Sequence, residues 1–224
     1  MRQLSQHMRS LSVGNWQAGV GRSPRGRTLG IYGYGGIGAE VVRYVAVLGV
    51  MVPVWARERH CRAGPRGWLA DLAGDKRIFF EACDVLALHM RLVKDTCGNV
   101  IVEGLDWTKP IAFLVNTGRA RLIERGALER PLQAGRPGMA AVDVYEDEPF
   151  RDPQHPLLRL PNVICTSHLG YVTEDEYEIQ FSDISLDRGL CGLTPHSRNQ
   201  PGSVGQPAGS CRLAHSRFAG IVRP

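Results

Sequence analysis

The sequence predicts an α/β fold built on a doubly wound parallel sheet. Short apolar runs alternate with segments of helical periodicity from Thr28 onward, which indicates parallel strands joined by helices. A glycine-rich turn follows the first apolar run, and polar side chains follow several later ones. Because ligands of open parallel sheets bind at the carboxyl ends of the strands, this pattern also predicts which edge carries a site.

The predicted elements divide the chain into three parts. We expect a helical arm and linker over residues 1–23, the α/β domain over 24–184, and a disordered or aberrant tail over 185–224. Pro131 is expected to kink or shorten the second predicted helix. Strands are predicted over residues 28–35, 51–56, 84–90, 111–116, 139–145 and 162–168, and helices over 37–49 and 122–135.

The composition excludes several classes of protein. Hydrophobic residues make up 43% of the 224 residues, which is ordinary for a globular protein. No apolar run approaches the roughly 20 residues that cross a bilayer. The basic start of the chain lacks the apolar stretch of a secretory signal. We therefore expect a cytoplasmic protein with no membrane partner.

Charge and cysteine usage exclude two more classes. Much of the net charge of +5 lies in residues 185–224, so the predicted domain is nearly neutral and has no basic stripe for nucleic acid. The six cysteines are scattered and form no C-x-x-C pair. We expect them to be free thiols in a reducing compartment, and we expect no metal site.

A glycine motif carries the strongest functional signal. Residues 33–38, Gly-Tyr-Gly-Gly-Ile-Gly, form a G-x-G-x-x-G between a predicted strand and a predicted helix. Gly33 permits the tight turn, Gly35 lets the backbone approach a pyrophosphate, and Gly38 lets the helix pack on the strand. An ordinary glycine turn is the alternative. The two flanking elements favour a Rossmann-type domain that binds a dinucleotide, NAD or NADP.

The end of the second predicted strand bears on the choice of cofactor. The acidic residue that would hold the ribose hydroxyls is absent, because Ala56 occupies its place and Arg57 follows. An arginine there can accept a 2′-phosphate. The sequence thus favours NADP over NAD, with solvated surface charges at Arg57 and Arg59 as the alternative.

Three polar residues near strand ends are candidates for catalysis. Arg119 follows a buried strand, and its guanidinium can hold a carboxylate bidentately. His168 ends another strand, and Glu148 follows an acidic run. A histidine hydrogen-bonded to a carboxylate is held in one tautomer and can exchange a proton near neutrality. Each residue also has a plainer interpretation, as a structural histidine or a solvated loop charge.

At this point the sequence resembles a known family, the D-isomer-specific 2-hydroxyacid dehydrogenases. The resemblance covers roughly residues 1–184 and rests on ordered motifs rather than on the glycine string alone. The motifs are GRTLGIYGYGGIG, CDVLALHMRL, FLVNTGRARLIERGAL, AAVDVYEDEP and NVICTSHLGY.

The resemblance implies an NAD(P)-dependent oxidoreductase that interconverts small 2-keto acids and D-2-hydroxy acids, usually as a homodimer. It implies catalytic roles for Arg119, Glu148 and His168. It also implies cofactor contacts from the backbone of Gly36 and Ile37, from Thr117, and from Asp143 to the nicotinamide carboxamide. Arg119, His168 and Gly170 complete the expected cofactor contacts.

Members of the family carry a substrate domain before the nucleotide-binding domain, and we expect that domain to be missing from this chain. Hydride transfer requires a closed cleft between the two domains. Two hypotheses follow. The chain is an oxidoreductase of the family type, or it is a truncated, non-catalytic module for cofactor binding and dimerisation.

Overall fold

The computed structural model describes residues 4–56, 69–70 and 75–187. The chain divides into two compact units, residues 1–173 and 174–224. The second contributes helix α8 (Glu174–Asp187), whose first turn is acidic and so complements the positive end of the helix dipole. Arg57, Arg59 and the predicted tail beyond residue 187 lie outside the described residues. The first unit holds the sheet and the candidate site.

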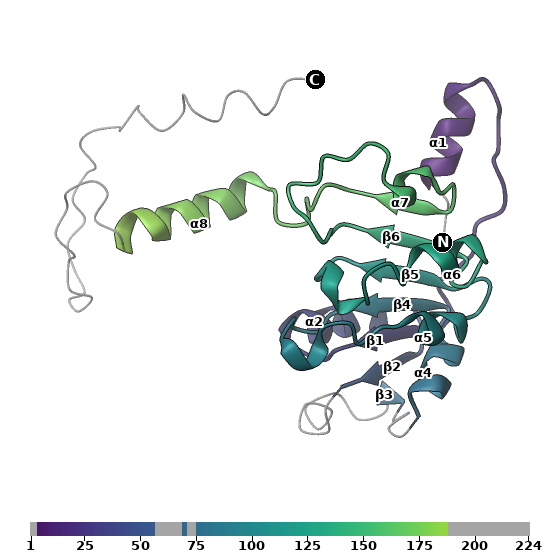
Figure 1. Cartoon of the computed structure of the whole chain (residues 1–224), viewed down its shortest axis with the longest axis horizontal. Helices are drawn as coiled ribbons and strands as arrows, with labels where there is room; N and C mark the ends of the chain where they lie inside the picture. The colour runs from purple at the N-terminus through teal and green to yellow at the C-terminus, as the bar shows by residue number, and fades with distance from the viewer. Residues whose placement is uncertain (1–3, 57–68, 71–74, 188–224) are drawn as a thin grey trace. The chain divides into compact units, whose positions relative to one another are not determined.

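Seven described strands form one sheet, in which every neighbouring pair is parallel. Their order is β3-β2-β1-β4-β5-β6-β7 (Figure 1). The chain runs from β1 outward to β3 and then returns to form β4 on the other side of β1. This order defines a doubly wound, Rossmann-type sheet and confirms the predicted fold class. The strands are β1 (Leu29–Tyr32), β2 (Val52–Trp55), β3 (Leu69–Ala70), β4 (Val85–Leu88), β5 (Phe113–Asn116), β6 (Met139–Val142) and β7 (Val163–Cys165).

The register brings the carboxyl ends of six strands into line. One row of paired Cα atoms crosses the sheet through the last residue of each strand. The row is Trp55, Tyr32, Leu88, Asn116, Val142 and Cys165. The chain leaves the sheet after this row at one common edge. Gly33, Thr117, Asp143 and Thr166 are each the first residue beyond it.

Side chains alternate between the two faces of the sheet and build a core on each. Tyr32, Leu88 and Leu114 belong to the larger core, together with residues of helices α4 (Lys76–Ala82), α5 (Val102–Asp106) and α6 (Glu129–Gln133). Ile31 and Ala87 point to the opposite face, where Val42 of helix α2 (Gly36–Ala46) covers them. This alternation is expected for strands buried on both faces.

One predicted helix is wrong over most of its length. The sequence predicted a helix over residues 122–135, but α6 covers only Glu129–Gln133. Gly126 has φ +73°, a left-handed conformation that a helix does not continue through. Pro131 is tolerated only in the first turn of a helix, so the helix begins just before it. The remaining short elements are α1 (Leu4–Ser12), η1 (Lys94–Thr96), η2 (Ala120–Leu122) and α7 (Pro156–Arg159).

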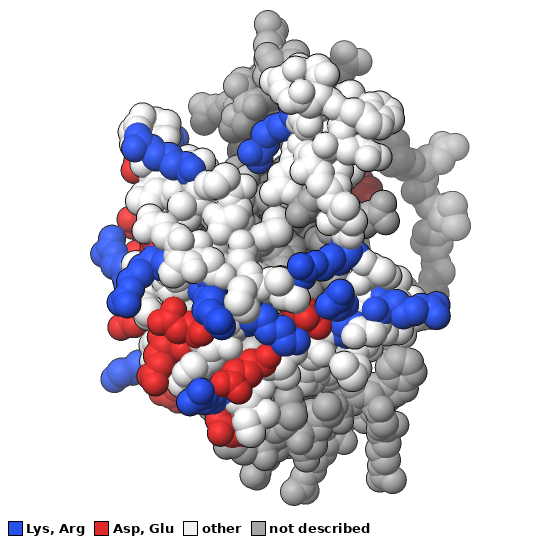
Figure 2. Space-filling view, turned by 90° about the vertical axis from the view of Figure 1, so that its right-hand side faces the viewer, with Lys and Arg blue, Asp and Glu red and all other residues white. Residues whose placement is uncertain are grey.

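Cations gather at the edge where the strands begin, which faces the viewer in Figure 2 with acidic residues among them. Lys109 donates to the carbonyl of Ala82 at the end of α4, and Arg136 donates to the carbonyl of Thr108 just after α5. Helices between parallel strands end at this edge with unpaired carbonyls. Cations stabilise such ends through the helix dipole, so these two contacts have a structural cause.

In the described ranges, no helix has the length and apolar character needed to cross a membrane. Within the same ranges, no group of three or more His, Cys, Asp or Glu side chains is arranged to hold a metal ion. Cys83, Cys97 and Cys165 are free thiols.

An aromatic cluster anchors α4 to the sheet, and its loss should destabilise the domain. The Phe79 ring lies 5.8–6.0 Å from the rings of Tyr32, Trp55 and Phe80, and its side chain is fully buried. We expect Phe79→Ala to lower the free energy of unfolding by about 3–5 kcal/mol because it leaves a cavity. Urea unfolding measures the change. Ile78→Ala is the control, since Ile78 is 51% exposed, and a similar loss there would contradict the assignment.

Candidate active site

The glycine motif forms a tight turn between β1 and α2. Gly33 has φ +108°, and a Cβ there would lie 2.5 Å from the backbone nitrogen of Met90. A Cβ on Gly38 would lie 2.5 Å from the carbonyl oxygen of Gly33. Only glycine fits at either position, because each backbone packs directly against another. The positive φ at Gly33 agrees with the tight turn expected there, and the close contact at Gly38 agrees with the close helix packing expected for that glycine.

The same turn leaves its outer side open. A Cβ on Gly35 or Gly36 would meet no atom of the described residues within 4 Å, and Ile37 is 72% exposed. Among the residues that the structure describes, no side chain caps α2, and its first turn carries no acidic residue. Its first amide groups lack partners within the helix and therefore suit an anion. The residues present fit the pyrophosphate of a dinucleotide, which requires close backbone approach and free amides.

A second turn follows β5. Asn116 is buried, its side-chain oxygen accepts the amide of Gly118, and its side-chain nitrogen donates to the carbonyl of Arg119. These bonds shape the backbone from Thr117 to Arg119 and leave both of those side chains exposed. The arrangement presents Arg119 and Thr117 at the edge where ligands of such sheets bind.

Asp143 holds the turn after β7 in place. It is the first residue beyond β6 and only 5% exposed. Its carboxylate accepts the hydroxyl of Thr166 and the amides of Leu169 and Gly170, the amides at 3.0 and 3.2 Å. Burial opposes ionisation of Asp143, but these hydrogen bonds outweigh it, so its pKa lies below the ordinary value. The anchored turn encloses His168, whose φ of 54° is unusual for a residue other than glycine.

His168 and Glu148 form the central contact of the site. The Nδ1 atom of His168 lies 2.7 Å from Oε2 of Glu148, and Oε1 of Glu148 accepts the amide of Tyr145 at 2.8 Å. The rings of His168 and Tyr171 meet edge to face at 5.1 Å. With Nδ1 directed at the carboxylate, the second ring nitrogen, Nε2, is the one left for proton exchange.

The environment keeps the Glu148 carboxylate ionised. Burial opposes ionisation, but the amide of Tyr145, the hydrogen bond to His168 and the charges of His168 and Arg119 lower its pKa. A carboxylate in this state can hold an imidazole in one tautomer and stabilise its protonated form.

The structure thus brings most of the predicted residues to one edge. The residues that follow strand ends at this edge are the glycine motif, Thr117, Arg119, Asp143, Glu148, His168 and Gly170. Arg57 lies outside the described residues, so its predicted role is not tested. Sequence reasoning did not assign the supporting roles of Asn116, Tyr145 and Thr166. The only available signal was their position within one or two residues of the predicted sites.

A Rossmann-type domain with a glycine turn and an Arg, Glu and His set at its carboxyl edge is typical of nicotinamide-dependent oxidoreductases. The family model described as D-isomer specific 2-hydroxyacid dehydrogenase, NAD binding domain, matches residues 1–170. The chain therefore belongs to the D-isomer-specific 2-hydroxyacid dehydrogenase family and contains its NAD-binding domain. This confirms the resemblance seen in the sequence.

Individual relatives agree with this assignment. The D-3-phosphoglycerate dehydrogenase of Archaeoglobus fulgidus is 31% identical over 184 residues, which cover 78% of this chain and 33% of that protein. The glyoxylate reductase of Aeropyrum pernix is 33% identical over 159 residues, which cover 70% of this chain and 46% of that protein. A crystal structure of a putative D-3-phosphoglycerate dehydrogenase from Ralstonia solanacearum superposes with a TM-score of 0.77 and 40% identity, covering 84% of this chain and 59% of that one. The chain thus spans a third to a half of these two curated relatives.

Replacing the Asp143 carboxylate should destabilise the domain in a pH-dependent way. We expect Asp143→Asn to lower the free energy of unfolding at pH 7 by about 1–3 kcal/mol, because an amide cannot accept all three hydrogen bonds. The folded pKa of Asp143 lies below its ordinary value. Its contribution is therefore present above about pH 4 and is lost as the pH falls through the folded pKa.

Urea unfolding of both proteins from pH 7 down to pH 3 measures this effect, and the gap between them should narrow on acidification. The matched control is Asp106→Asn, at an exposed residue, with an expected change below about 0.5 kcal/mol. A gap that stays constant with pH would contradict the role assigned to the carboxylate.

Proposed function

We propose that the chain binds NAD(P)H at the glycine turn and interconverts 2-keto acids and D-2-hydroxy acids. The observation that carries this proposal is the 2.7 Å contact between His168 and Glu148, at the sheet edge that also bears the glycine turn and Arg119. The names of the relatives support the substrate class, since they include a glyoxylate reductase. Small 2-keto acids such as glyoxylate or hydroxypyruvate are the substrates that we propose.

Each residue of the site has a distinct role in the proposed reaction. Arg119 binds the substrate carboxylate and polarises the adjacent carbonyl. His168 gives a proton from Nε2 to the carbonyl oxygen during reduction and takes it back during oxidation. Glu148 holds Nδ1 and stabilises the charged imidazole. The nicotinamide cofactor, when bound, supplies or accepts the hydride.

The proposed cofactor preference is for NADP. Strand β2 ends at Trp55 and is followed by Ala56, not by the acid that would hold a ribose hydroxyl and repel a 2′-phosphate. Arg57 comes next in the sequence and can pair with that phosphate. Tighter binding of NADPH than of NADH is therefore the expected result.

Titration of the chain with NADPH and NADH, followed by fluorescence, tests cofactor binding. Glyoxylate or hydroxypyruvate is then added, and the absorbance of the reduced nicotinamide is recorded to detect turnover. Binding with turnover supports the proposal. Binding without turnover favours the second hypothesis, a cofactor-binding and dimerisation module. Failure to bind either cofactor overturns both.

Removing the proton donor should slow turnover far more than it weakens cofactor binding. We expect His168→Gln to reduce turnover by about 10²–10⁴-fold, the usual contribution of general acid–base catalysis, with the dissociation constant of NADPH within about threefold of wild type. The control is His155→Gln, since His155 lies on the loop before α7 and caps that helix. Equal turnover by His168→Gln and wild type would remove His168 from the mechanism.

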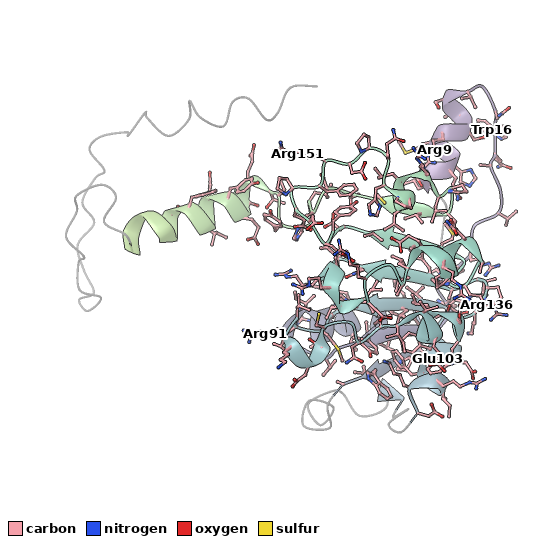
Figure 3. The ribbon with its side chains drawn as sticks, viewed as in Figure 1. Arg9, Trp16, Arg91, Glu103, Arg136 and Arg151 are labelled. Carbon is pink, nitrogen blue, oxygen red and sulfur yellow. The ribbon has the colours of Figure 1, made fainter. Side chains whose placement is uncertain are left out.

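We further propose that the protein is a cytoplasmic homodimer. Leu4, Met8 and Leu11 lie on one face of α1 and are 60–71% exposed, and Trp16 beyond it is 79% exposed (Figure 3). An apolar surface of this kind marks an interaction site, and a second copy of the chain is the occupant that we propose. The free thiols of the described cysteines suit a reducing compartment.

A charge on this face of α1 should dissociate the dimer. We expect Met8→Glu to convert the dimer into a monomer, as measured by size-exclusion chromatography with light scattering, because an unpaired carboxylate would be buried in the contact. Gln6→Glu adds the same charge on the opposite side of the helix and should remain dimeric. A wild-type monomer, or dimers for both variants, would contradict the proposed interface.

A further inference from the structure

The loop that follows β4 packs directly against the glycine turn. The amide of His89 donates to the carbonyl of Tyr32 at 2.9 Å, just before the turn. The next residue, Met90, has its backbone against Gly33, where a Cβ would lie 2.5 Å from the Met90 nitrogen. Arg91 follows immediately. Its main chain is therefore held one residue away from the turn that is shaped for a phosphate.

The position of Arg91 is fixed from its other side as well. The hydroxyl of Thr96 donates to the carbonyl of Arg91 at 2.7 Å and accepts the amide of Val93 at 2.9 Å. These bonds close the loop onto η1 and restrict the backbone from which the Arg91 side chain extends. Because this backbone is already ordered, a ligand that binds the Arg91 side chain does not have to order the loop as well.

The charge of Arg91 has no structural use among the described residues. Its side chain is exposed, and none of the salt bridges formed between described residues involves it. Figure 3 shows Arg91 on the side of the domain where the strands end, and Arg136 on the opposite side. Arg136 donates to the carbonyl of Thr108. Arg91 therefore differs from the cations at the other edge, which hold helix ends.

The strand order indicates which phosphate Arg91 would meet. Strand β1 lies between β2 and β4, so the loops after β2 and β4 flank the glycine turn on opposite sides. The ribose and any 2′-phosphate belong to the β2 side, at the end of that strand. The pyrophosphate belongs to the glycine turn and the first amides of α2. The Arg91 main chain lies on the β4 side, away from the position of the 2′-phosphate, and the phosphate site next to it is the one at the glycine turn.

We propose that Arg91 binds the pyrophosphate of the cofactor, adding a mobile guanidinium to the fixed amides of the glycine turn. This inference rests on the proposed cofactor site and deepens it. A guanidinium on a phosphate forms charge-assisted hydrogen bonds, which are stronger than neutral ones. Because NADH, NADPH and ADP-ribose all carry the pyrophosphate, Arg91 should strengthen the binding of all three equally.

The test measures binding alone, by calorimetric titration of the whole chain with NADH, NADPH and ADP-ribose. Arg91→Gln should weaken the binding of each ligand by about tenfold and make binding less sensitive to added salt. Arg91→Lys should restore part of the loss. Arg159→Gln is the matched control, because Arg159 is also exposed and ends α7 at the opposite edge. Circular dichroism checks that each variant is folded.

The outcomes separate this inference from the proposed function. Equal losses for the three ligands in Arg91→Gln, with an unchanged control, support the pyrophosphate contact. Wild-type affinity in Arg91→Gln overturns the contact and leaves the cofactor site intact. A loss confined to NADPH also overturns it, since the guanidinium would then meet the 2′-phosphate. If the wild-type chain binds none of the ligands, the proposed function fails together with the inference.

Discussion

The in-register parallel pairing of the strands is the constraint on which the rest of the structure depends. Tyr32, Leu88, Asn116 and Val142 are paired in one row and each ends its strand. Every loop that carries a candidate functional group therefore starts from the same line. A shift of one residue in any strand would turn its side chains to the other face and displace its loop. The site is thus a consequence of backbone hydrogen bonding across the sheet.

A second layer of hydrogen bonds turns this line of strand ends into a site. Asn116 shapes the turn that presents Arg119, and Asp143 reaches across from β6 to hold the turn that carries His168. Both side chains are buried and polar. Other conformations of the two turns would leave these buried groups without hydrogen-bond partners, which costs free energy. His168 keeps its positive φ because residues on both sides of it are bound to Asp143. Thr117 and Arg119 are exposed, whereas the Asn116 and Asp143 side chains that shape the two turns are buried.

The electrostatic design of the domain follows from the direction of its helices. Helix α2 starts at the edge where the strands end, and its amides favour an anion. Helix ends at the other edge favour cations, which Lys109 and Arg136 supply. Glu148 is an anion on the anion-binding edge, and it is stabilised there by His168, Arg119 and the Tyr145 amide. The Glu148 carboxylate therefore binds His168 and is not left unpaired to repel an anionic ligand.

The sequence alone predicted the fold class, the positions of all the described strands except β3, the glycine turn and, as a hypothesis, the pairing of Glu148 with His168. These follow from local rules, because apolar runs, glycine spacing and family motifs are all read along the chain. It did not determine the length of α6, where Gly126 and Pro131 acted together. Nor did it indicate that Asp143 would bind the turn after β7, 23–27 residues away. Only the tertiary structure decided those contacts, because they depend on which strands become neighbours and in which register. A pattern of neighbouring residues does not specify either.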